Sequence, residues 1–339
     1  MTSLATTIMG LDLRSPIVVA ACPISSYLNR IQEAEDHGAG AVVIRTLFEE
    51  QLADGPSTKP PLNPDSGMFF PHNRHGALAE HLHWVAKTRK QVSMPLIGSL
   101  NAEQPEHWVR YAIALQDSGC DALELNCYSV EADLATSSIQ IEQRLHDTVA
   151  AVIDAVDIPV SVKLSPFYTA LGHVAGGLAQ AGVRALVFFN RFLQPSIDPH
   201  HMNLRLGPPP PSRSDEIGLP LRWTGLLAGR LGNCQLVLNT GVHNGLDVVR
   251  ALLAGAAAAQ CASALLEHGV SYLTVMQRQI EGWMHHHDMA DIASFQGQLK
   301  DLSVNDPTAY ERAQYMRSLM LHEPSTTITR LNQRRSINS

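Results

Sequence analysis

Reactive polar side chains follow an apolar run near the middle of the chain. Residues 122–125 are mostly apolar, and Asn126, Cys127, Tyr128 and Ser129 come directly after them. Such a run indicates a buried strand, and the amide, thiol and hydroxyl groups beyond it suit hydrogen bonding, proton transfer or nucleophilic attack. Taken alone, Cys127 and Ser129 also fit a purely structural role. In a barrel of parallel strands, catalytic residues lie at this end of the strands.

A lysine closes a second predicted strand. Lys163 follows residues 160–162, Val-Ser-Val, and precedes Leu-Ser-Pro. An ammonium group is costly to bury without a partner, so a lysine here is rarely a packing residue. It fits either an ion pair with an acid at the rim or a positive charge placed against an anionic cofactor or intermediate.

Small residues end the last two predicted strands. Thr240 and Gly241 follow one of them, and Ala262 and Ser263 follow the other. Backbone amides can approach an anion closely at such residues, and the loops after strands seven and eight of a barrel often bind phosphate. Plain turns use the same residue types, so the pattern alone leaves both interpretations open.

Two kinds of strand signature alternate along the chain and predict how these residues are positioned. Some apolar runs follow a proline, and others follow a glycine and small residues, with helical periodicity between them. About eight strand–helix units result, which predicts an α/β fold, a (β/α)₈ TIM barrel. A doubly wound sheet is the alternative, but no Gly-x-Gly-x-x-Gly follows the first strand. Further strands are expected to end on Arg45, Ser99, Lys163, Asn190 and Thr240.

The chain is longer than a barrel of about 250 residues requires. We expect one barrel domain over residues 1–322, with long proline-rich rim insertions at about 47–75 and 191–219, and a polar tail over 323–339.

Composition excludes several classes of function. The net charge of −7 provides no basic surface for nucleic acid, and no apolar run approaches the ~20 residues of a membrane span. We therefore expect a cytoplasmic protein that binds neither nucleic acid nor membrane. The five cysteines form no C-x-x-C pair, so neither a metal site nor an iron–sulfur cluster is expected. Three consecutive histidines, His285 to His287, face different directions on a helix and indicate a solvated helix end.

In this order, the strand-end residues resemble those of the dihydroorotate dehydrogenase family, FMN-dependent (β/α)₈ barrels, and most closely its soluble dihydroorotate dehydrogenase-like bacterial branch. The resemblance extends from Thr7 to about Met320. It is most specific at residues 47–51, 122–126 and 162–167 and at Phe-Asn-Arg-Phe, residues 189–192.

The resemblance implies a set of ligand-binding residues. Lys163 would stabilise negative charge on the reduced flavin, and the residues after the last two strands would hold the FMN phosphate. In the family, the catalytic base lies three residues after the asparagine that ends strand four, which is Ser129 here, with Asn126 and Lys163 as its catalytic partners. The implied cofactor residues are Ala20, Ala21, Arg45, Ser99, Asn126, Lys163, Asn190, Thr240, Gly241, Ala262 and Ser263. The implied substrate residues are Asn73, Asn126, Glu131 and Asn190.

Two departures from the family pattern concern the substrate. Members that oxidise dihydroorotate have Pro-Asn after the base, where this chain has Val130 and Glu131, and Asn73 lies in a remnant of their Gly-Leu-Pro-Asn loop. A carboxylate at Glu131 would repel the carboxylate of orotate if both faced one pocket. Arg45 replaces the lysine that usually ends strand two.

The resulting hypothesis is an FMN oxidoreductase of pyrimidine metabolism, acting on CH–CH bonds by hydride transfer between flavin and a small substrate. Its partners would be that substrate, a soluble electron acceptor or redox partner, and a second copy in a homodimer. One alternative is an FMN enzyme of the same fold with a substrate other than dihydroorotate. Others are a flavin-free lyase or aldolase-like barrel that uses Lys163 as a Schiff-base nucleophile, and a barrel that binds a metabolite without catalysis.

Overall fold

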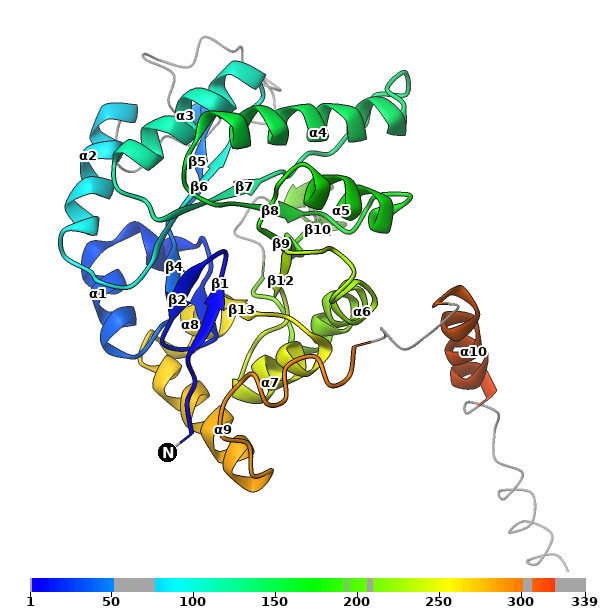
Figure 1. Cartoon of the computed structure of the whole chain (residues 1–339). Helices are drawn as coiled ribbons and strands as arrows, with labels where there is room; N and C mark the ends of the chain where they lie inside the picture. Colours follow the sequence, from blue (N-terminus) through cyan, green and yellow to red (C-terminus); the bar gives the residue numbers. More distant parts are fainter. Residues whose placement is uncertain are drawn as a thin grey trace, which may run out of the picture. The chain divides into compact units, whose positions relative to one another are not determined.

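Short apolar runs form the strands of a closed parallel barrel in the computed structural model (Figure 1). The structure describes residues 2–51, 77–192, 194, 196–205, 210–300 and 307–320. Within these ranges, eight strands pair in a ring in which β3 contacts both β4 and β13, and β4 contacts β6. In ring order they are β3 (Ile17–Val19), β4 (Ala41–Val43), β6 (Leu96–Asn101), β7 (Ala122–Asn126), β8 (Val160–Leu164), β9 (Ala185–Phe188), β12 (Gln235–Leu238) and β13 (Ala258–Cys261).

Helices follow the barrel strands in the described chain, as the alternating signatures predict. The amphipathic pattern from Ile141 to Val156 corresponds to α4. Gly119 and Gly182, with φ of 94° and 103°, make the left-handed turns that lead from a helix into the next strand. The described helices between residues 1 and 300 are α1 (Leu28–Asp36), α2 (Leu78–Arg89), α3 (Pro105–Asp117), α4 (Ser138–Ala155), α5 (Leu171–Gln180), α6 (Gly218–Leu227), α7 (Gly245–Ala254), α8 (Ser263–His268) and α9 (Tyr272–His286). The prediction of a (β/α)₈ barrel is confirmed.

Alternation along the strands separates two buried clusters. One set of side chains packs against the helices, while the other fills the barrel interior. The hairpin of β1 (Thr6–Ile8) and β2 (Leu11–Leu13) adds apolar side chains to the interior cluster. The barrel side chains of that cluster are Val18, Ala41, Val43, Ile97, Ala122, Ala185, Val187, Val237 and Ala258.

Extra elements border the loops that follow the strands. β5 (Leu47–Phe48) pairs with the end of β6 and leads into the 3₁₀ helix η2 (Glu49–Gln51). The predicted insertion at 47–75 continues beyond the described residues. The insertion at 191–219 contains an antiparallel hairpin, β10 (Ser196–Asp198) with β11 (Asn203–Arg205), and a 3₁₀ helix, η3 (Ser214–Ile217).

Contacts divide the chain into two units, Met1–Lys300 and Asp301–Ser339. In the second unit, the described residues form the helix α10 (Pro307–Met320). The tail predicted at 323–339 lies outside the described residues. No helix in the described part of the chain has both the length and the apolar character needed to cross a membrane.

Candidate active site

The barrel interior changes from apolar to polar near the carboxyl ends of its strands. Lys163 on β8 donates a hydrogen bond from Nζ to Gln260 Oε1 at 2.9 Å, and its Nζ lies 3.5 Å from Glu124 Oε1. Gln260 Nε2 in turn donates to Glu124 Oε2. All three side chains are buried. Lys163 is therefore ion-paired, which was one of the two interpretations of the sequence. Its partner Glu124, however, lies inside the barrel and not at the rim.

Two asparagines form an amide pair above this layer. Asn126 lies opposite Lys163 in the register of β7 with β8, and its Oδ1 accepts a hydrogen bond from Asn190 Nδ2. Asn101, at the end of β6, donates to the carbonyl oxygens of Asn126 and Tyr128, at 2.7 and 3.3 Å. These bonds fix the chain at the point where β7 leaves the barrel. Asn126 is thus the neighbour of both Lys163 and Asn190, and the roles of the three toward a ligand stay predictions.

The first two barrel strands, β3 and β4, lead into small side chains and a second cation, Arg45. Burial raises the pKa of Cys22, just after β3, while the positive charges of Lys163 and Arg45 act to lower it. Ala20 is buried, and its backbone N–H donates to Cys261 O at 3.0 Å, which joins β3 to β13. Ala21 is partly buried and packs against the interior cluster.

Ser99 does not end its strand as predicted. It lies inside β6, is fully buried, and its hydroxyl shares a hydrogen bond of 2.9 Å with Thr46 Oγ1. Arg45, Asn190 and Thr240 also lie two residues beyond the strands they were expected to end. These three corrections shift the residues into the loops at the barrel mouth.

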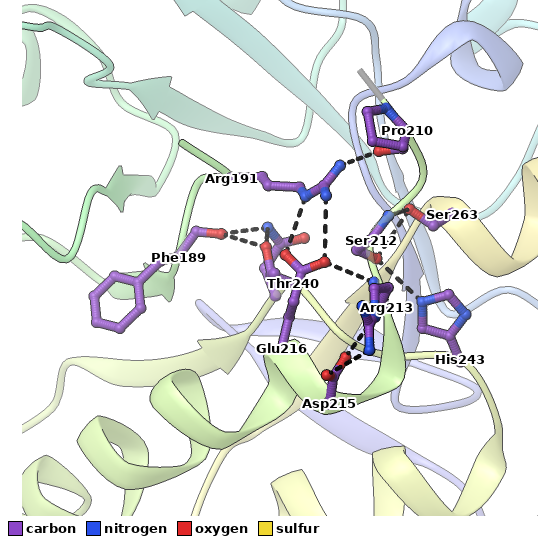
Figure 2. A network of polar contacts seen from close by, with 11 residues as sticks. Phe189, Arg191, Pro210, Ser212, Arg213, Asp215, Glu216, Thr240, His243 and Ser263 are labelled. Atoms are coloured by element: carbon purple, nitrogen blue, oxygen red, sulfur yellow. Dashed lines mark hydrogen bonds and ion pairs between the residues drawn. The ribbon is translucent and has the colours of Figure 1, made fainter. Parts of the chain in front are cut away.

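Hydroxyl groups gather beside the loops after β12 and β13 (Figure 2). Ser212 Oγ donates to Ser263 Oγ at 2.9 Å and lies 3.1 Å from His243 Nε2, and the Ser212 amide also donates to Ser263 Oγ at 2.9 Å. Ala262, before Ser263, is partly buried against the core. Ser212 and His243 are functional candidates that the sequence did not single out. Ser212 follows the run of four prolines, and its contact with Ser263 crosses 51 residues of chain.

A second group of polar contacts joins the segment after β9 to η3 and to the loop after β12 (Figure 2). Arg191 binds both carboxylate oxygens of Glu216, at 3.1 and 3.2 Å, and also donates to Pro210 O. Thr240, at φ 75°, donates from its hydroxyl to Phe189 O at 3.0 Å. A Cβ on Gly241 would lie 2.3 Å from the backbone nitrogen of Ile217. Glycine is therefore required there by the packing of η3, independently of any ligand.

Ser129 lies in a different part of the rim. It is exposed and lines a cavity of about 430 Å³ beside α3 and α4, whose described lining includes Asn101, Tyr128 and Arg144 but not Lys163 or Asn190. Burial raises the pKa of the neighbouring Cys127 to about 12, so its thiol stays protonated near neutrality. The catalytic role of Ser129 remains a prediction.

Glu131 is paired with a cation that the sequence analysis did not identify. Its carboxylate accepts a hydrogen bond from Arg144 Nη2, on the second turn of α4. The capping box of Ser137 and Gln140 starts this helix, with Ser137 Oγ accepting from Gln140 N at 3.3 Å. The ion pair offsets part of the repulsion expected between Glu131 and an anionic substrate. Asn73, also predicted to bind substrate, lies outside the described residues.

The three consecutive histidines lie at the end of α9 and form no described contact with these residues. His285, His286 and His287 are exposed at the end of α9, as predicted. No group of three potential metal ligands was found among the described residues. The described part of the barrel mouth thus presents a paired ammonium, amides and hydroxyls.

These features define a (β/α)₈-barrel protein whose polar residues converge at the carboxyl ends of its strands, the arrangement of barrel enzymes. No family model matches the chain. Among curated proteins, dihydroorotate dehydrogenase B (NAD(+)) catalytic subunits match it from Thermoplasma volcanium, at 24% identity over 84% of the chain and 94% of the relative, and from Methanosarcina acetivorans, at 25% over 85% and 93%. The subunit from Methanothermobacter thermautotrophicus is 29% identical over 55% of the chain, and this match spans 61% of that relative's length. The chain is thus similar in sequence to dihydroorotate dehydrogenase catalytic subunits, which confirms the predicted resemblance to that family.

Proposed function

We propose that this protein is an FMN-dependent oxidoreductase that transfers a hydride between flavin and a small substrate at a CH–CH bond, as dihydroorotate dehydrogenases do. The observation that carries the proposal is Lys163. In this protein, which is similar in sequence to these enzymes, Lys163 is buried, and its ammonium is held by a hydrogen bond to Gln260. Lys163 also lies in register with Asn126 at the barrel mouth.

The donor set fits FMN. A flavin mononucleotide needs hydrogen-bond donors and a cation near its ring and an anion site for its phosphate. Lys163, Asn126 and Asn190 offer the first, and the hydroxyls of Ser212 and Ser263 offer the second. Ala20 and Ala262, after β3 and β13, have small side chains that take up little of the space beside a flat ring system.

Each residue then has a defined task in the reaction. FMN, when bound, supplies the ring that accepts or donates the hydride. Lys163 would stabilise negative charge, the amides of Asn126 and Asn190 would orient the substrate, and Ser129 Oγ would take or return the proton. An unassisted serine is a poor base, so a water or a neighbouring group would have to draw the proton from it. The electron acceptor would be a soluble molecule or a partner chain, and the protein would act as a homodimer.

A substrate other than dihydroorotate is the main alternative, and one observation favours it. Val130 and Glu131 stand where the resemblance would imply Pro-Asn, and the Glu131 carboxylate is paired with Arg144. The loop therefore offers fewer amide donors to the substrate carboxylate.

The flavin-free lyase is less well supported. A Schiff-base lysine must bring its nitrogen to a carbonyl carbon, whereas Lys163 Nζ donates to Gln260 and lies 3.5 Å from Glu124 Oε1, so it would first have to leave these partners. Borohydride trapping of a carbonyl substrate on Lys163 would favour the lyase. Substrate binding without turnover with any acceptor would instead favour a non-catalytic barrel.

Anaerobic titration tests the proposal and separates the substrates. We expect the purified protein to bind FMN and its flavin absorbance to bleach when a substrate is added. Bleaching by dihydroorotate identifies that substrate, whereas an FMN-loaded protein that dihydroorotate leaves oxidised requires a different one. A protein that takes up no FMN contradicts the proposed function.

A further inference from the structure

Glu124, Lys163 and Gln260 form a closed ring of polar contacts inside the barrel. They come from β7, β8 and β13, and β13 is not adjacent to either of the other two strands, so the ring spans the interior. The side chains of Lys163 and Glu124 are only 8% and 1% exposed, which isolates both charges from water.

Chemistry determines the orientation of the amide in this ring. An ammonium only donates hydrogen bonds and a carboxylate only accepts them. Gln260 satisfies both when its oxygen faces Lys163 and its nitrogen faces Glu124, as observed. Gln260 therefore links the cation to the anion and fixes the ammonium position.

Glu124 lies deeper than the residues that face the mouth. It precedes Asn126 by two residues on the same face of β7, which places it about 6–7 Å further into the barrel. Its Oε1 accepts no hydrogen bond from any described residue, so its interaction with Lys163 is electrostatic. Glu124 thus cancels part of the positive charge that Lys163 presents to the mouth without reaching the mouth itself.

We propose that Glu124 is a positioning residue that acts through Lys163 and Gln260 to set the reduction potential of bound FMN. This inference rests on the proposed function. Reduced FMN carries negative charge, so a stronger positive charge at Lys163 favours it over oxidised FMN and raises the potential. The carboxylate of Glu124 holds that preference down.

Two variants change the charge of the ring in opposite directions. Glu124→Gln removes the carboxylate at nearly constant size, and we expect reduced FMN to gain at least tenfold in affinity relative to oxidised FMN. For a two-electron couple, a tenfold gain corresponds to an upward shift of about 30 mV. Gln260→Glu adds a carboxylate beside the ammonium, and we expect the potential to fall.

Ser161→Ala is the matched control. Ser161 lies opposite Glu124 in the register of β7 with β8, is 3% exposed, and donates its hydroxyl to Leu123 O at 2.9 Å. It is a buried barrel residue outside the ring, so we expect its replacement to leave the potential unchanged.

The experiment measures the potential of bound FMN and the affinities of both redox forms in the FMN-loaded protein and its variants. Opposite shifts in the two variants support the inference, and a downward shift in Gln260→Glu alone supports it if Glu124→Gln does not fold. Unchanged potentials, with both redox forms losing affinity equally, would show a merely structural role and overturn it. A wild-type protein that binds no FMN overturns the proposed function as well, so the two failures are distinguishable.

Discussion

Replacing Lys163 with methionine should destabilise the protein even in the absence of FMN. The change leaves the carboxylate of Glu124, 1% exposed, without the cation that lies 3.5 Å away. At an effective dielectric constant of ~20, two unit charges at this separation interact with about 5 kcal/mol. Breaking a buried ion pair by removing one partner typically costs about 3–5 kcal/mol. We therefore expect Lys163→Met to lower the free energy of unfolding by about 3–5 kcal/mol.

Urea unfolding of the FMN-free protein, followed by circular dichroism, measures this loss. With a slope of about 3 kcal/mol/M, the midpoint should fall by roughly 1 M or more. The exposed Lys87 on α2 provides the control, and Lys87→Met should change stability by no more than about 0.5 kcal/mol.

A double variant separates the charge effect from general damage to the barrel. Lys163→Met combined with Glu124→Gln leaves no unpaired charge, so it should recover most of the lost stability. The reasoning is refuted if Lys163→Met costs under about 1 kcal/mol, or if the double variant is less stable than the single one.

Three further predictions concern the rim and the core. Gly241→Ala should lower the free energy of unfolding by about 1–3 kcal/mol, because the added Cβ would meet the Ile217 backbone. Gly232→Ala is the control and should cost less, since Gly232 also has a positive φ but has open space around it. Urea midpoints that rank the two variants the other way would contradict this prediction. Ser129→Ala should reduce the rate of flavin reduction by about 10²–10⁴-fold in stopped-flow measurements without changing FMN affinity, and an unchanged rate would exclude Ser129 as the base. Because burial raises the pKa of four thiols to about 12, iodoacetamide at pH 8 should alkylate them far more slowly in the native than in the unfolded protein. The same neutral thiols favour the folded state below pH ~9, and their contribution to the free energy of unfolding is lost as the pH rises toward 12. Comparable rates in both states would contradict the protection of these thiols, of which Cys120, Cys234 and Cys261 are buried and Cys127 is partly buried.

The barrel was predictable because local sequence signals repeat with each unit. Proline or glycine starts an apolar run, and a helical pattern such as that of α4 follows. The ends of strands were less predictable because they depend on pairing with distant residues. β6 continues past Ser99 because Leu47 and Phe48 pair with Leu100 and Asn101.

The site was predictable only where polar residues end apolar runs. Lys163, Asn126 and Asn190 met that condition, and the structure brings them together. Glu124 and Gln260 lie inside strands, where no strand-end signal marks them. Counting two residues back from Asn126 along the inward face would have found Glu124, but its contact with Gln260 crosses 136 residues and needs the closed barrel.

The visible absorption spectrum of the purified protein tests the central claim most directly, followed by mass identification of any released cofactor. The account predicts a flavin spectrum, or its appearance when FMN is added, with FMN as the released molecule. A colourless protein that binds no added FMN would contradict it.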